Sequence, residues 1–191
     1  AIIYNGANLE AGWFNVTNCR FYRTTGDAIQ INDLQSYIGT IERCLFFQCV
    51  HTLNVTHYAD HLSLKNCWIS VKSMTVNYDA SILFADIGEL VVDGCLFVPT
   101  GFSTPNILCA YIKCAGNCTI VNSHFGGEAG SMPILITDVQ NASLTEGNFV
   151  IRDCPQTYSQ NNGRALILIK SHFHKIEVDN CIGFADVQKP V

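Results

Sequence analysis

A short motif recurs seven times along the chain, and this repetition constrains the fold more than any other feature. Its pattern is an apolar residue, any residue, Asn or Gly, Cys or a small residue, any residue, and an aromatic or apolar residue. Clear copies span 14–21, 40–46, 62–69 and 90–97, and weaker copies span 120–125, 144–149 and 176–182. The small-residue position is occupied in turn by Cys19, Cys44, Cys67, Cys95, Ser123, Gly147 and Cys181. Such self-similarity is the sequence signature of stacked repeat architectures.

A second apolar segment lies between successive copies of the motif, at 28–32, 53–56, 82–85, 107–110, 134–137 and 167–170. Alternation of apolar residues with period two predicts β-strands, and no window shows helical periodicity. A unit of roughly 25 residues with two or three short strands, stacked on itself, is a β-solenoid. We therefore predict an all-β fold of about seven coils. Propeller blades need roughly 40 residues or more, and a Greek-key sandwich would not explain the Cys column.

The motif also predicts a bend within itself. Val16, Cys19 and Phe21 are all apolar, yet a straight strand would place Val16 and Cys19 on opposite faces. One residue must turn the chain, and Asn and Gly tolerate positive φ better than other residues. The predicted turn column is Asn18, Arg43, Asn66, Gly94, Asn122, Glu146 and Asn180.

With these repeats and this turn, the chain resembles the right-handed parallel β-helices of the pectin-lyase-like superfamily. Its first residues do not resemble a signal peptide, its cysteines look like free thiols and its charged residues are few, and in these features it most resembles a bacteriophage tailspike or tail-fibre domain. The resemblance covers nearly the whole chain but matches no catalytic signature. It implies a right-handed single-stranded parallel β-helix, with residues 1–191 as one domain, expected to be a fragment of a longer chain. It also implies a virion-tail location, a homotrimer, and recognition of a host cell-surface polysaccharide, with cleavage of that glycan left open. A secreted polysaccharide lyase or glycoside hydrolase and a structural spacer of a viral fibre are the alternatives.

Composition excludes several partners. The chain has 11 Lys and Arg against 16 Asp and Glu, a net charge of −5, whereas nucleic-acid binders usually show a basic face. No segment approaches the roughly 18 apolar residues of a membrane helix, so no membrane insertion is expected. The ten cysteines follow no zinc spacing, and we predict neither a metal nor a cofactor. They are expected to be buried structural thiols, with disulfides between neighbouring coils as the alternative.

Columns of equivalent residues predict the inner and outer surfaces of the rod. The inward aromatic column is expected to be Phe21, Phe46, Phe97, Phe125 and Phe149. An outward column of alternating charge is expected at Thr17, Glu42, Lys65 and Asp93. Two outward apolar columns are expected, one with Leu45, Trp68 and Leu96 and the other with Leu83, Leu108, Leu135 and Leu168. Exposed apolar stripes usually mark interfaces, here either a trimer contact or a surface covered by loops of the same chain.

Stacked carboxylates are the first candidates for catalysis. Glycoside hydrolysis needs two carboxyl groups roughly 5–10 Å apart, and successive coils would bring Asp33, Asp60 and Asp86 together after the recurrent second strand. Asp27 and Asp79, just before that strand, are a second possibility. His57 is the acid–base candidate from the cluster 57–61, which we place in a turn. The plain alternative is that these are turn-forming, solvated side chains.

Carbohydrate-binding candidates combine aromatic and amide side chains. Aromatic rings are amphipathic platforms on which sugar rings stack. The potential platforms, wherever they are exposed, are Trp13, Trp68, Tyr78, Tyr111 and Tyr158. The predicted binding residues are Trp68, Tyr58, Tyr78, Gln30 and Asn54.

Overall fold

The computed structural model of the chain describes residues 1–4, 12–32, 37–49, 51–55, 59–72, 82–83, 87–100, 108–113, 116–126, 132–137, 147–157, 167–169 and 174–181. All regular elements in these segments are β-strands, and they form four sheets. In spatial order, sheet A contains β1 (Ile2–Tyr4), β4 (Asp27–Ile31), β7 (His51–Val55) and β10 (Ile82–Leu83). Sheet D contains β13 (Leu108–Lys113), β16 (Met132–Thr137) and β19 (Ile167–Ile169).

Two longer sheets complete the architecture. Sheet B contains β2 (Gly12–Thr17), β5 (Tyr37–Glu42), β8 (Ala59–Lys65), β11 (Ile87–Asp93), β14 (Asn117–Val121), β17 (Asn148–Arg152) and β20 (Lys175–Asp179). Sheet C runs from β3 (Arg20–Tyr22) through β6 (Leu45–Cys49), β9 (Trp68–Lys72), β12 (Leu96–Thr100) and β15 (His124–Gly126) to β18 (Gln156–Thr157). The pairings within all four sheets are parallel.

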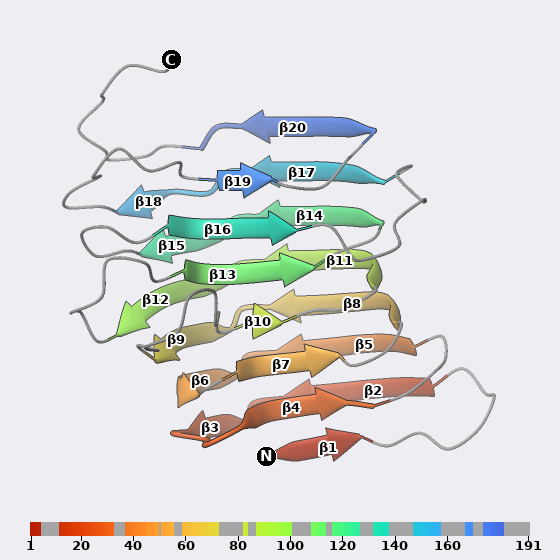
Figure 1. Ribbon diagram of the computed structural model, residues 1–191, viewed down its shortest axis with the longest axis vertical. Helices are drawn as coiled ribbons and strands as arrows, with labels where there is room; N and C mark the ends of the chain where they lie inside the picture. The colour runs from red at the N-terminus through yellow and green to blue at the C-terminus, as the bar shows by residue number, and fades with distance from the viewer. Residues whose placement is uncertain are drawn as a thin grey trace.

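The chain winds as a β-solenoid. From β2 onward, successive strands belong to sheet B, then sheet C, then sheet A or D, before the chain returns to sheet B one level higher. In Figure 1, the near strands run to the right and the strands of sheet B behind them run to the left, while the chain climbs from the N-terminus. This combination is a right-handed winding. The predicted all-β, right-handed parallel solenoid is therefore confirmed, whereas the number of coils stays a prediction.

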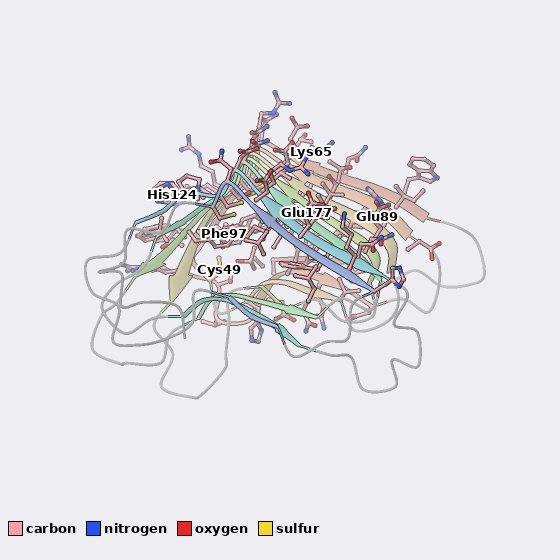
Figure 2. All side chains as sticks on the ribbon, turned by 90° about the horizontal axis from the view of Figure 1, so that it is seen from above. Cys49, Lys65, Glu89, Phe97, His124 and Glu177 are labelled. Carbon is pink, nitrogen blue, oxygen red and sulfur yellow. The ribbon has the colours of Figure 1, made fainter. Side chains whose placement is uncertain are left out.

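Apolar side chains from the sheets fill the interior. In β8, Leu62 and Leu64 are completely buried while Lys65 is exposed, as alternation along a strand requires. In sheet C, Phe21 stacks on Phe46 with ring centroids 4.8 Å apart, and Phe97 on Phe125 at 4.7 Å. Each fully buried side chain of this size contributes roughly 1.5–3 kcal/mol to folding. The inward placement of these four aromatics is confirmed, and Figure 2 shows Phe97 inside the triangular cross-section.

Phe149 was also predicted to face inward, and its burial confirms this, but it does not belong to the same column as the other four aromatics. It lies in β17 of sheet B, in register with Cys118 of β14. It is buried there, but on a different wall of the rod. The reason is that the motif copy at 144–149 ends in the strand β17, whereas the chain turns from sheet B to sheet C only after β17, at Asp153.

The corner between sheets B and C is made by one residue per coil. These residues all have φ between 46° and 63°: Asn18, Arg43, Asn66, Gly94, Asn122, Asp153 and Asn180. The backbone N–H groups of the first six donate to carbonyls of the next coil, as from Asn18 to Glu42 at 3.1 Å and from Asn66 to Asp93 at 2.9 Å. The predicted one-residue bend is confirmed in six of its positions. In the sixth coil the turn residue is Asp153 and not Glu146, so the cysteine column contains Cys154 where Gly147 was predicted.

Gly147 belongs to another corner, at the start of sheet B. A Cβ atom on Gly147 would lie 2.3 Å from the carbonyl oxygen of Gly116, and one on Gly116 would lie 1.9 Å from that of Gly88. Real Cβ atoms do not approach backbone so closely. Glycine is therefore required at Gly116 and Gly147 by the close stacking of neighbouring coils.

The cysteines of the B–C corner are free thiols that face inward. Their Sγ–H groups donate to the carbonyl two residues earlier, as from Cys44 to Glu42 at 3.3 Å and from Cys67 to Lys65 at 3.3 Å. Burial raises the pKa of Cys44 to about 11, and it raises the pKa of Cys154 to about 11 as well. These thiols act as small buried side chains that satisfy backbone carbonyls.

Two of the three predicted outward columns are confirmed by the register. Thr17, Glu42, Lys65 and Asp93 are successive Cα partners in sheet B. Leu45, Trp68 and Leu96 are successive partners in sheet C, and Trp68 and Leu96 are exposed.

The third predicted column is wrong at Leu108. Leu135 is in register with Tyr111 and Leu168, whereas Leu108 is in register with Met132. The register therefore places Leu108 three residues away from the position that Leu135 pairs with, Tyr111. Leu83 is in register with Asn54 of the preceding coil.

Candidate functional site

The predicted site residues that the structure describes lie on three different sheets. Asp60 is near the start of β8 in sheet B, Trp68 begins β9 in sheet C, and Gln30 and Asn54 lie in sheet A. They therefore do not converge on one site. Asp33, Asp86, His57, Tyr58, Tyr78 and Asp79 lie outside the described residues, so the predicted stack of carboxylates stays a prediction.

The cluster 57–61 differs from the prediction in its described part. β8 begins at Ala59, so Asp60 and His61 are in a strand and not in a turn. The parallel pairing of β8 with its neighbours extends over these residues and holds them in an extended conformation.

Gln30 and Asn54 are neighbours on the first coils of sheet A. Their strands β4 and β7 pair with Gln30 opposite Asn54 and with Asp27 opposite His51. Both strands have the same burial pattern, in which the first and fourth residues are half-buried and the other three are buried. Polar residues occupy all four half-buried positions, which are Asp27, Gln30, His51 and Asn54, whereas Thr52 is polar and buried.

Three of these side chains form a hydrogen-bonded chain. Asp27 Oδ1 lies 2.6 Å from His51 Nδ1, and Asp27 Oδ2 accepts a hydrogen bond from Asn54 Nδ2 at 2.8 Å. The side chains of His51 and Asp27 are only 25% and 15% exposed. With Nδ1–H donating to the carboxylate, the Nε2 atom of the neutral ring carries the free lone pair. The cluster thus presents an oriented imidazole base.

A second carboxylate–imidazole pair lies on sheet B. His61 and Glu89 are Cα partners on β8 and β11, and His61 Nδ1 lies 2.8 Å from Glu89 Oε2. These side chains are more exposed, 32% for His61 and 48% for Glu89. Figure 2 shows Glu89 on the outer face of sheet B, on the far side from the ridge where Lys65 lies.

The His61–Glu89 pair belongs to a column of outward side chains, which we call the B strip. Its members are Trp13, Ile38, His61, Glu89, Asn117, Asn148 and Lys175. Trp13 is 74% exposed, the largest exposed fraction among the exposed large apolar side chains of the described residues. Asn148 donates its backbone N–H to Asn117 Oδ1 at 2.9 Å. The B strip therefore combines an aromatic face with hydrogen-bonding groups on one surface.

Each of the two pairs has an unsatisfied hydroxyl nearby along its strand. Thr52 directly follows His51, and Ser63 follows His61 by two residues on the same face of β8. Within the described part of the chain, Thr52 Oγ1 and Ser63 Oγ are the buried side-chain oxygens without a hydrogen-bond partner.

A charged network at the end of sheet B has a different character. Lys175 Nζ lies 2.9 Å from Glu177 Oε2, Arg152 also pairs with Glu177, and Arg152 Nε lies 3.4 Å from Asp179 Oδ2. Lys175 and Arg152 lower the pKa of the Glu177 carboxyl, and Glu177 raises the pKa of the Arg152 guanidinium. All these groups are solvated, so the network aligns β17 with β20 and offers no enclosed site.

Sequence reasoning missed His51 and Glu89. A partial signal for His51 was available, because Asp27 and His51 are 24 residues apart. Asp27 directly precedes the segment 28–32, and His51 lies two residues before the segment 53–56. Asp27 was grouped only with Asp79. Glu89 carries no such signal, since only the register of β8 with β11 brings it to His61.

Neither a metal-binding group nor a membrane helix is found in the described part of the chain. Its His, Cys, Asp and Glu side chains form no group of three or more that would hold a metal ion. It also includes no helix long and apolar enough to cross a bilayer. No protein-family model matches the chain, and searches of curated proteins and of solved structures return no match.

Proposed function

We propose that this β-solenoid recognises a polysaccharide, which lies along the B strip. The observation that carries the proposal is the presence of an exposed Trp13 and the His61–Glu89 pair in a single column of side chains. The indole face stacks on the apolar face of a sugar ring. The imidazole and the carboxylate exchange hydrogen bonds with sugar hydroxyls.

The spacing of these groups favours a polymer over a monosaccharide. Trp13 is two strands from His61 and three from Glu89, which corresponds to roughly 10 and 14 Å between Cα atoms at 4.8 Å per strand. One sugar ring does not cover that length, whereas a chain running along the solenoid axis contacts both ends. Asn117 and Asn148 continue the B strip with amide and backbone groups. The buried hydroxyl of Ser63, two residues after His61 in β8, lies beside the B strip.

The resemblance of the repeat to phage tailspikes supports a host cell-surface polysaccharide as the partner. In this proposal the chain acts on the outside of a virion, as part of a homotrimer. A secreted lyase or hydrolase would use the same kind of surface as a monomer. A spacer of a viral fibre would bind no glycan at all.

The test is a binding measurement with a panel of bacterial capsule and lipopolysaccharide glycans, together with the oligomer mass. The variant Trp13→Ala is expected to weaken binding about tenfold or more, because the stacking platform is lost. The matched variant Trp68→Ala removes an exposed indole from sheet C and is expected to bind as the wild type does. Loss of binding in Trp68→Ala alone would place the glycan on sheet C and overturn the proposal. Absence of binding by the wild type would favour a spacer.

A further inference from the structure

We propose that the Asp27–His51–Asn54 cluster of sheet A hydrolyses acyl esters, with His51 as the general base and Asp27 as its positioning residue. The substrate class, acylated hydroxyls of a glycan, rests on the proposed function. The chemistry itself rests on the cluster, which lies on a different sheet from the B strip.

The first argument is orientation. Asp27 uses one carboxylate oxygen for His51 and the other for Asn54, at 2.6 and 2.8 Å. The carboxylate cannot rotate without losing one of these bonds, so the imidazole is held with Nε2 directed away from the carboxylate. A base oriented by a third group is the arrangement that activates hydroxyls or water in hydrolytic enzymes.

The second argument is burial. His51 and Asp27 are both less exposed than their counterparts in the His61–Glu89 pair. Solvent therefore screens the Asp27–His51 interaction less. The carboxylate stabilises the imidazolium that forms when Nε2 takes a proton.

The third argument concerns the type of reaction. The cluster contains one carboxylate, and both of its oxygens are already engaged, whereas glycosidases use two carboxyl groups across the scissile bond. An oriented imidazole with neighbouring amide donors suits the attack of water on a carbonyl. Gln30, in register with Asn54, supplies an amide N–H on the same strand pair for the oxygen that becomes charged.

The reaction balances without any further reagent. His51 Nε2 takes a proton from water, the water oxygen bonds to the acyl carbon, and the carbonyl electron pair moves onto its oxygen. That pair then re-forms the carbonyl as the bond between the acyl carbon and the sugar oxygen breaks. The sugar oxygen takes the proton from His51. The products are a carboxylic acid and a free sugar hydroxyl, and nothing is oxidised or reduced.

The experiment follows the hydrolysis of p-nitrophenyl acetate and the release of acetate from an O-acetylated polysaccharide by the full chain. His51→Gln is expected to lower kcat/KM a hundredfold or more, as for the loss of a general base. His124→Gln, which changes a histidine of sheet C, is the matched control and is expected to keep the wild-type rate. Added imidazole is expected to restore part of the activity of His51→Ala. Asp27→Asn is expected to lower kcat and shift the pH–rate profile, with partial recovery in Asp27→Glu.

Several outcomes would overturn the inference. Equal losses in His51→Gln and His124→Gln would mean that any surface histidine supplies the rate. A wild-type rate no faster than that of free imidazole would mean that the cluster is structural. If His51→Gln does not fold, the pH–rate profile of Asp27→Asn decides, since a merely structural Asp27 would leave it unmoved. Hydrolysis of the small ester without glycan binding would overturn only the proposed function, and glycan binding without hydrolysis only this inference.

Discussion

The two carboxylate–imidazole pairs contain the same chemical groups at nearly the same separation, yet they differ in their surroundings. Asp27 and His51 are the first residues of strands in sheet A, half-buried and fixed by Asn54. His61 and Glu89 are each the third residue of a seven-residue strand, on the open face of sheet B. A charge with two partners and little solvent is held in place, whereas an exposed pair competes with water and salt. This difference is the basis on which we propose a catalytic role for the first pair and a role in recognition for the second.

Burial should have its largest effect on stability at the Cys44 and Cys154 thiols, which are more completely buried than either carboxylate–imidazole pair. Below pH 9.0 the Cys44 and Cys154 thiols are protonated in both the folded and the unfolded chain. Between pH 9.0 and about 11 the unfolded chain releases these protons and the folded chain keeps them, because burial has raised the folded pKa of each thiol to about 11. Stability should therefore be constant below pH 9.0 and should fall as the pH rises to about 11, by about 1.4 kcal/mol per pKa unit for each thiol. Urea unfolding across this range measures it.

The control for the alkaline effect is Cys44→Ala. This variant should start from a lower stability but lose less of it between pH 9.0 and about 11, because one of the two thiols no longer titrates. An unchanged slope would show that the thiols are not the source.

A smaller effect is expected from removing one partner of each pair. Asp27→Ala leaves His51 and Asn54 half-buried without their acceptor and should lower the free energy of unfolding by about 1–3 kcal/mol. Glu89→Ala leaves a solvated His61 and should lower it by about 1 kcal/mol at most. Urea titrations of both variants at neutral pH give the two values. Equal losses would remove the distinction between the pairs.

The smallest effect is the response of each pair to salt. A double-mutant cycle on His61 and Glu89 should give a coupling of about 0.2–1 kcal/mol in dilute buffer, and most of it should vanish in about 1 M NaCl. The same cycle on Asp27 and His51 should keep most of its coupling, since the pair is less accessible to ions. A salt response of the same size in both cycles would contradict the assignment of roles.

The B–C corner was predictable because a single residue decides it. Val16 and Cys19 are both apolar and must both face inward, so the chain must bend between them. Asn18 can adopt the positive φ that this bend needs. This steric rule uses no information from distant parts of the chain. It also predicts the turn at Arg43, where φ is 52° although arginine has no preference for that conformation.

The sixth coil was not predictable in the same way. Gly147 and Phe149 satisfy the motif, but the pairing of β17 with β14 places the turn at Asp153. Gly147 is required elsewhere, because the backbone of Gly116 approaches it too closely for a side chain. A weak motif has two acceptable alignments, and the ladder of backbone hydrogen bonds selects one.

The repeat, the residue that bends it and the side chains that face inward were determined by the sequence, since each depends on alternation and sterics within a few neighbouring residues. The tertiary structure alone decided which polar side chains meet. His51 reaches Asp27, and Glu89 reaches His61, only because the register of one coil on the next places them opposite each other. That register is fixed by the burial of the whole coil and the hydrogen bonds along it. It therefore reflects many residues at once, and no local pattern reveals it.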